Sequence, residues 1–203
     1  MKILFAHGFE GSNGGTKPTY LRDTLGHEVI APTMYGLGWT FEGHVQSVLK
    51  ALDTQPDIRA VVGSSMGGFA STVALSRRPE LKVVAVLLAP AIGIHQKWAD
   101  TYGPETMERW AKEGSIQYWH RSLERNIDLP YTFWTQCRDA ADVTMQHPCV
   151  IIHGVDDDVV PIANSEALFA RSSGVKSLIK TDDGHRLSAS LDRLAPALNS
   201  LTQ

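Results

Sequence analysis

The sequence predicts an α/β fold, in which a parallel sheet carries helices on both faces. Short runs of β-branched and aliphatic residues, apolar on both faces, alternate with segments of helical periodicity. Fully buried strands that alternate with helices indicate a parallel sheet, because parallel neighbours need crossover connections. The six predicted strands are KILFAH (2–7), HEVIAP (27–32), IRAVVG (58–63), KVVAVLLAP (82–90), CVIIHG (149–154) and VKSLIKT (175–181). The clearest predicted helices are 41–52, 69–78, 164–171 and 186–198.

The length of the chain favours one compact domain over residues 1–203. A formal net charge of -3 gives no electrostatic reason to expect a nucleic-acid partner. No apolar run reaches the ~18 residues of a membrane span, and the first residues, MKILFAHG, turn polar too early for a signal peptide. Of the two cysteines, Cys149 lies in an apolar run where a buried thiol is expected. We therefore expect a cytoplasmic protein without a membrane partner, and the sequence leaves open whether it forms a homo-oligomer.

The alternation of strands and helices is interrupted once, over residues 91–148. This segment is too long for a simple connection, so we interpret it as a lid inserted into the domain. Within it we expect a helix in 104–114, a hairpin or strand pair in 115–129 and a second helix in 131–142.

Aromatic residues are concentrated in this insert, which holds four of the five tryptophans and three of the five tyrosines of the chain. Two interpretations stand side by side: the rings form a small core of the insert itself, or they line a substrate pocket. The candidates for the second role are Trp110, Trp119 and Trp134.

The stretch VVGSSMGG, residues 61–68, follows the third predicted strand and contains a G-x-S-x-G pattern with Ser65 at its centre. At a sharp strand-to-helix turn the central residue is forced into a strained conformation, and the flanking glycines let neighbouring backbone pass without a Cβ clash. The turn presents the serine at the carboxyl edge of the sheet, beside helix amides that favour negative charge. We take Ser65 as the candidate nucleophile. The alternative is a purely structural turn, because glycine and serine are common in turns.

A serine hydroxyl is a poor nucleophile unless a base removes its proton. His185, in TDDGHRLSAS, follows the last predicted strand and is expected to open the last helix, at the same edge of the sheet as Ser65. It is therefore the candidate base.

The imidazole in turn needs a carboxylate that fixes its tautomer and stabilises its charged form. HGVDDDVVP, residues 153–161, offers three adjacent aspartates after the preceding strand. We choose Asp157, because it lies midway between His153 and Pro161, where the next helix is expected to begin. Asp158 and Asp156 are the second and third choices, and two of the three aspartates are expected to be solvated turn residues.

An oxyanion hole needs two backbone donors that point to where negative charge develops. The amide of Met66, directly after the nucleophile, is one candidate, and the amide of Phe9, in the loop after the first strand, is the other. Gly8 permits close approach of that loop. The residues expected to border the substrate here are His7, Gly8 and Ser64. The alternative is that His7 and Gly8 only form a tight turn.

The segments HGF (7–9), GSSMGG (63–68), HGVDDDVVP (153–161) and DGH (183–185) together resemble the α/β-hydrolases, over most of the chain outside the insert. The small size is similar to that of the compact bacterial esterases of the YqiA type. This resemblance implies a serine hydrolase that cleaves carboxylic esters of small or medium acyl groups through an acyl-enzyme, with Ser65, Asp157 and His185 as the triad. It also implies a six-stranded sheet in the order 2-1-3-4-5-6, with residues 91–148 as the variable lid.

Other readings of the sequence fare less well. GSNGGTK (11–17) lacks the frame of a phosphate-binding loop, and G-x-G-x-x-G after the first strand, H-E-x-x-H and C-x-x-C are all missing. We therefore expect no cofactor and no metal, and a small-molecule ester as the substrate. A thioesterase, peptidase or perhydrolase on the same triad remains an alternative, as does a non-catalytic binding protein with this fold.

Overall fold

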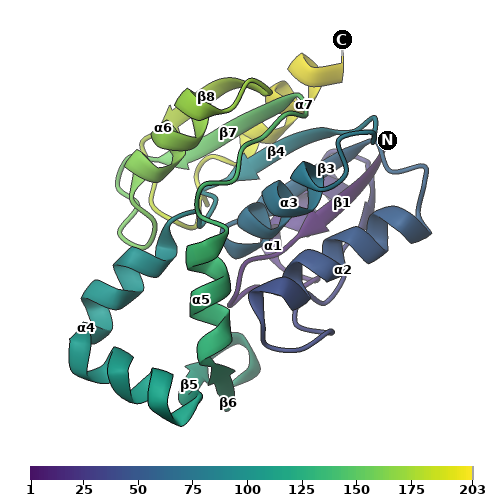
Figure 1. Cartoon of the computed structure of the whole chain (residues 1–203). Coiled ribbons are helices and arrows are strands. Elements are labelled where there is room, and N and C mark those ends of the chain that lie inside the picture. Colours follow the sequence, from purple (N-terminus) through teal and green to yellow (C-terminus); the bar gives the residue numbers. More distant parts are fainter. Residues whose placement is uncertain (203) are drawn as a thin grey trace.

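The computed structural model describes residues 1–202 and has a six-stranded parallel sheet in the order β2-β1-β3-β4-β7-β8 (Figure 1). The strands are β1 Lys2–Ala6, β2 Glu28–Ile30, β3 Ala60–Ser64, β4 Val84–Leu88, β7 Cys149–Gly154 and β8 Val175–Thr181. Numbering only these strands along the chain gives the order 2-1-3-4-5-6, which confirms the predicted topology.

Helices cover both faces of the sheet, because side chains alternate between two apolar clusters along each strand. Val61 and Leu87 lie in the cluster covered by α2 Phe41–Thr54, α3 Met66–Ser76 and α6 Ile162–Arg171. Val62 and Val86 lie in the opposite cluster. The elements that cover it are the π-helical turn Tyr20–Thr24, which continues α1 Thr16–Thr19, the 3₁₀ turn Leu191–Arg193 and α7 Leu194–Thr202. Both cysteines, Cys137 and Cys149, are buried and unpaired.

The segment between β4 and β7 forms a helix, a hairpin and a second helix, grouped at the lower side of the molecule in Figure 1. These elements are α4 Ile94–Glu113, β5 Ser115–His120, a 3₁₀ turn Arg121–Leu123, β6 Arg125–Pro130 and α5 Tyr131–Asp139. The hairpin and the helix predicted in 131–142 are confirmed. The helix predicted in 104–114 is the second half of α4, which is broken at Gly103, where φ is 72° and proline follows.

Aromatic rings form a core within this insert. Trp110 is fully buried, and its indole Nε1 donates a hydrogen bond to the Leu129 carbonyl at 2.9 Å. Its ring packs against Tyr102 and Tyr131, and Trp98 stacks on Phe133. The hairpin and α4 are therefore joined through buried aromatic contacts rather than by chain connection alone.

The predicted helix over 186–198 is wrong in its first part, because residues 186–190 form turns and the α-helix begins at Leu194. The Asp183 carboxylate explains the difference. It accepts hydrogen bonds from the amides of Gly184 and Ala189 and from the Ser190 hydroxyl, which satisfies locally the donors that a helix would have used.

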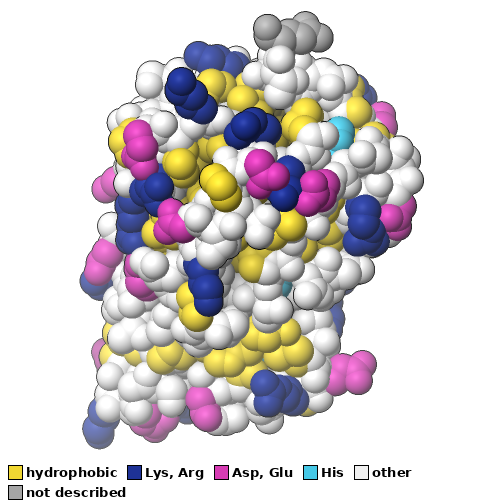
Figure 2. Space-filling view, turned by 90° about the vertical axis from the view of Figure 1, so that its right-hand side faces the viewer, with side chains coloured by type: hydrophobic (Ala, Val, Ile, Leu, Met, Phe, Trp, Pro, Cys, Tyr) yellow, Lys and Arg dark blue, Asp and Glu magenta, His cyan; other side chains and the backbone are white. Residues whose placement is uncertain are grey.

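Charged side chains of both signs are scattered among apolar ones on the face shown in Figure 2, without a large patch of one sign. This distribution agrees with the small net charge. Of the helices formed by residues 1–202, none is both long and apolar enough to cross a membrane.

Candidate active site

Ser65 lies at the turn between β3 and α3, with φ 53° and ψ -119°. Its amide donates to the Leu88 carbonyl at 2.8 Å, and its carbonyl accepts from the amides of Phe69 and Ala91, both at 3.0 Å. The flanking glycines permit the turn: a Cβ on Gly67 would lie 2.1 Å from the Ala6 carbonyl oxygen. The strained backbone is therefore held by close packing of strand, helix and turn.

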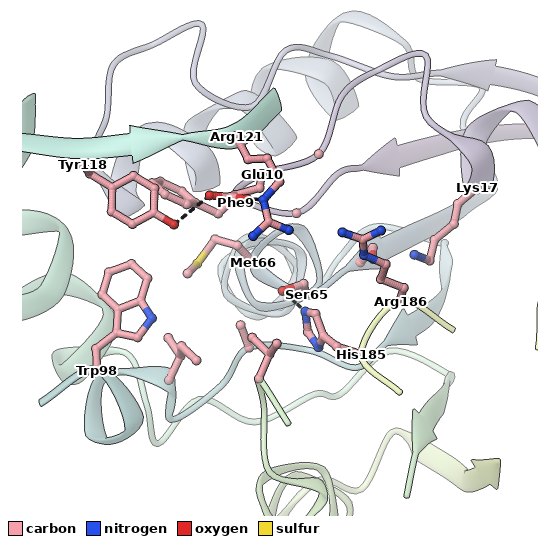
Figure 3. A pocket seen from close by; sticks show the side chains of 16 residues that line it. Phe9, Glu10, Lys17, Ser65, Met66, Trp98, Tyr118, Arg121, His185 and Arg186 are labelled. Carbon is pink, nitrogen blue, oxygen red and sulfur yellow. Dashed lines mark hydrogen bonds and ion pairs between the residues drawn. The ribbon is translucent and has the colours of Figure 1, made fainter. Parts of the chain in front are cut away.

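The structure brings the three predicted side chains into one hydrogen-bonded chain. The Ser65 Oγ lies 2.9 Å from the His185 Nε2 (Figure 3), and the His185 Nδ1 lies 2.8 Å from the Asp157 Oδ2. Asp157 is in the loop after β7 and His185 in the loop after β8. Parallel strands place these loops at one edge of the sheet, so residues distant in sequence meet there.

The Asp157 side chain is completely buried and accepts four hydrogen bonds. Its Oδ1 accepts from the amides of Val159 and Val160, and its Oδ2 from His185 and from the Nε2 of His153 at 3.1 Å. Burial alone would raise the pKa of Asp157, but the hydrogen bonds from His153, His185 and Val160 together hold it well below its usual range. The carboxylate therefore stays ionised beside the imidazole, whereas Asp156 and Asp158 are exposed.

This shift in pKa gives a testable pH dependence of stability. An Asp pKa that is lower in the folded protein stabilises the fold above about pH 4, and the effect is lost as the pH falls towards the folded value. Between about pH 5 and pH 3, the free energy of unfolding should fall by about 1 kcal/mol more in the native protein than in Asp157→Asn. Urea unfolding at both pH values measures this, with Asp156→Asn as the control that behaves like the native protein. An equal fall in native protein and Asp157→Asn would contradict the expectation.

His153, on β7, is a functional candidate that the sequence interpretation used only as a landmark. It is fully buried, and its Nε2 lies 3.0 Å from the Val160 carbonyl as well as close to Asp157. Its Nδ1 lies 2.7 Å from the Ser165 hydroxyl of α6. His153 thus contacts the same carboxylate oxygen as His185 and helps to fix its position. Its position four residues before Asp157 is the sequence feature that could have indicated a contact with this carboxylate.

The two candidate oxyanion amides, those of Phe9 and Met66, border the same cavity as Ser65. Among residues 1–202, neither amide donates to an acceptor of the protein. The Gly8 carbonyl accepts from the Gly11 amide at 2.9 Å and from the His7 Nδ1 at 2.8 Å. In a trans peptide the carbonyl and the following N–H point in opposite directions, so fixing the Gly8 carbonyl also aims the Phe9 amide.

His7 acts in this loop through one tautomer. The Met34 amide donates to its Nε2 at 3.2 Å, so the proton lies on Nδ1 and is donated to the Gly8 carbonyl. Burial lowers the pKa of His7, which keeps the ring neutral and this tautomer in place. The next carbonyl, that of Phe9, lies 2.8 Å from the Nε2 of the buried His120 on β5. A histidine of the loop itself, His7, and a histidine of β5, His120, therefore hold the loop.

A cavity of about 610 Å³ opens beside Ser65. Of the residues predicted to border substrate, Gly8 and Ser64 line it, whereas His7 lines an adjoining cavity of about 310 Å³. The insert contributes one wall of the main cavity through Ile94, Trp98, Tyr118 and Arg121.

The expectation for the insert tryptophans is corrected. Trp110 is buried in the core of the insert, Trp119 is 58% exposed on the hairpin, and the indole of Trp134 donates to the His95 carbonyl and stacks on Tyr131. None of the three lines the cavity. The aromatic residues of the insert that do are Trp98 and Tyr118 (Figure 3).

No group of three or more histidine, cysteine, aspartate or glutamate side chains within residues 1–202 is arranged to hold a metal ion. The site is built from a serine, two histidines, a carboxylate and free backbone amides. Such an arrangement can activate a hydroxyl and stabilise a developing oxyanion.

The sheet order and the strand-to-helix turn at Ser65 define the α/β-hydrolase fold. Solved structures with the same fold include mouse α/β hydrolase domain-containing protein 10, with a TM-score of 0.78 and 22% identity over 99% of this chain and 89% of that chain. Est1E from Butyrivibrio proteoclasticus, solved with ferulic acid, has a TM-score of 0.76 and 19% identity over 99% and 87% of the two chains. The monoacylglycerol lipase of Paleococcus ferrophilus has a TM-score of 0.72 and 13% identity over 98% and 93%.

The chain belongs to the uncharacterised protein family UPF0227, whose family model matches residues 2–201. No curated protein sequence matches the chain significantly. The similarity to solved structures establishes the fold, and the chemistry of the site has to be inferred from its own residues.

Proposed function

We propose that this protein is a carboxylesterase-type serine hydrolase that acts through an acyl-enzyme. The observation that carries this proposal is the hydrogen-bonded chain Ser65–His185–Asp157, which ends at a cavity bordered by two free backbone amides. A buried, ionised carboxylate beside an imidazole that contacts a strained, half-buried serine in the wall of a cavity is the arrangement that activates a hydroxyl.

In the proposed reaction the Ser65 Oγ attacks the acyl carbon while the His185 Nε2 takes the hydroxyl proton. The amides of Phe9 and Met66 donate to the oxygen that becomes negative. His185 then gives its proton to the departing alcohol, which leaves Ser65 acylated. Water activated by the same imidazole releases the acid and restores the serine. Every step uses groups of the chain and water, so a cofactor is not required.

The size and lining of the cavity support a small or medium acyl group, because about 610 Å³ is at the scale of small-molecule sites. Solved structures of this fold that are named an esterase and a monoacylglycerol lipase are consistent with ester substrates. Thioesters, peptides and peracid formation use the same triad and are distinguished by assay rather than by the site.

Labelling with a fluorophosphonate probe tests the proposal directly. We expect stoichiometric labelling of the native protein and none of Ser65→Ala. Hydrolysis of p-nitrophenyl esters, acyl-CoA thioesters and peptide amides, together with peroxide-dependent acyl transfer, then ranks the acyl donors and acceptors. Absence of labelling in correctly folded native protein would favour a binding protein with an unused site.

His7 is expected to contribute to the rate through the Phe9 amide. In His7→Ala the Gly8 carbonyl loses one of its two donors, so the amide aimed at the oxyanion becomes less well fixed. We expect kcat for a p-nitrophenyl ester to fall by about tenfold, less than complete loss of an oxyanion donor, with little change in KM. His27→Ala is the matched control, since His27 lies at the edge strand beside the N-terminus. A rise in KM with unchanged kcat would instead make His7 a substrate-contacting residue.

A further inference from the structure

The cavity beside Ser65 has two chemically different ends (Figure 3). On one side of Ser65 lie Trp98 and Tyr118, which with Ile94 form an apolar wall. On the other side lie the side chains of Lys17 and Arg186, which line both the main cavity and the adjoining one. The candidate nucleophile therefore lies between an aromatic end, which also carries the ion pair of Glu10 and Arg121, and an end with the two cations Lys17 and Arg186.

The two cations at this end have no partner in the protein. Within residues 1–202, neither the Lys17 ammonium nor the Arg186 guanidinium forms a hydrogen bond or an ion pair. Lys112 and several other exposed cations are also without a partner in this part of the chain, and Lys17 differs from them because it is half-buried in the wall of a cavity. Lys17 is half-buried: burial lowers its pKa, the nearby Asp183 raises it in part and Arg186 lowers it again. The positive charge of a half-buried ammonium beside a guanidinium would be stabilised by a bound anion.

The acidic groups near this end are engaged elsewhere. Glu10 is the one acidic residue that lines either cavity, and it accepts from the Tyr118 hydroxyl at 2.8 Å and lies 3.8 Å from the Arg121 Nε. Asp183 uses its carboxylate for the turns that follow it. Asp183 therefore compensates the Lys17 charge only in part, and an anion bound in the cavity would supply the direct partner that neither Lys17 nor Arg186 has within residues 1–202.

The position of His185 decides which part of a substrate meets these cations. The imidazole has to donate its proton to the departing oxygen, so the departing group lies on the His185 side of the acyl carbon. Arg186 follows His185 directly, and the adjoining cavity beyond it is lined by the hydroxyl-bearing Ser12, Thr16 and Ser188. The acyl group then extends towards Trp98 and Tyr118.

We propose that the preferred substrates are esters whose departing alcohol carries an anionic group, a carboxylate or a phosphate, held by Lys17 and Arg186. This inference rests on the proposed function and specifies its substrate class. During acylation the bond from the Ser65 Oγ to the acyl carbon forms and the bond from that carbon to the departing oxygen breaks. That oxygen receives the serine proton through His185, and the cations bind the anionic alcohol without taking part in the bond changes.

Three butanoate esters with related phenolic departing groups test the proposal: those of 3-hydroxybenzamide, 3-hydroxybenzoate and 3-hydroxyphenyl phosphate. The first is neutral, and the other two distinguish a carboxylate from a phosphate site. We expect kcat/KM for at least one anionic ester to exceed that of the neutral ester by about tenfold, mainly through a lower KM. This preference should fall when NaCl is raised to about 0.5 M, because salt screens exposed charge.

Lys17→Gln and Arg186→Gln should each reduce the preference for the anionic ester several-fold. Arg121→Gln removes the same charge from the opposite end of the cavity, and Lys112→Gln removes one from the exposed surface of α4. Both controls should keep more of the preference than the Lys17 and Arg186 variants do. Thermal unfolding confirms that all four variants are folded.

Equal kcat/KM for the neutral and anionic esters, or equal loss on both esters in Lys17→Gln and Arg186→Gln, would overturn this inference while leaving the hydrolase in place. Failure of all three esters together with absence of fluorophosphonate labelling would overturn the proposed function, and this inference with it.

Discussion

Replacing Ser65 or His185 by alanine is expected to lower kcat for ester hydrolysis by about 10³-fold or more, the scale of loss when a triad member is removed. In the proposed mechanism, Ser65→Ala removes the atom that would form the acyl-enzyme. His185→Ala removes the group that lies 2.9 Å from that atom and would accept its proton. Steady-state kinetics on a p-nitrophenyl ester measures both losses, and circular dichroism shows that the fold is kept.

The double variant Ser65→Ala/His185→Ala should be no worse than the more damaging single variant, because the two groups act as one unit. Ser76→Ala, at the end of α3 and away from the cavity, is the matched control for serine replacement. Losses that multiply in the double variant, or residual activity of Ser65→Ala within about tenfold of native, would remove Ser65 from the role of nucleophile.

Asp157→Asn is expected to lower kcat by up to about 10⁴-fold, with little change in the packing around it. The Asp157 Oδ1 faces two backbone donors, the amides of Val159 and Val160. An asparagine therefore places its carbonyl oxygen there and its amide NH₂ towards His185. The imidazole has to accept at Nδ1, so its proton moves to Nε2, and the ring cannot take the Ser65 proton.

Asp156→Asn and Asp158→Asn are the matched controls, because both are exposed neighbours with the same chemical change. Each should keep activity close to native in the same kinetic assay. A large loss in Asp156→Asn or Asp158→Asn, with Asp157→Asn unaffected, would reassign the acid. Replacing Asp157 is also expected to loosen His153, which shares the same carboxylate oxygen.

The parts of the site that follow strands were predictable from the sequence. Ser65, Asp157 and His185 each come directly after an apolar run, and parallel strands bring such positions to one edge. The G-x-S-x-G spacing identified the turn because only glycine fits at position 67, where a Cβ would lie 2.1 Å from the Ala6 carbonyl oxygen. The strand order was predicted from the family resemblance.

The sequence did not predict which side chains of the insert line the cavity and which fill the core of the insert. Trp98 and Trp110 lie on the same broken helix, yet one lines the cavity and the other fills the core of the insert. The kink at Gly103 rotates the two halves of α4 against each other, so a helical period cannot be carried across it. The last helix was predicted to start at residue 186 and the α-helix starts at Leu194, for a similar local reason, the competing hydrogen bonds of Asp183.

The hairpin of the insert touches the loop after β1 at two points. Tyr118 donates to Glu10, and His120 lies within hydrogen-bond reach of the Phe9 carbonyl. If the hairpin moved outward to admit a large ligand, both contacts would have to break. The backbone that carries the Phe9 amide would then lose their support. Such an opening would couple access to the cavity with the position of a candidate oxyanion donor, so a ligand that keeps the hairpin open would lower the rate of the proposed reaction as well as its own affinity.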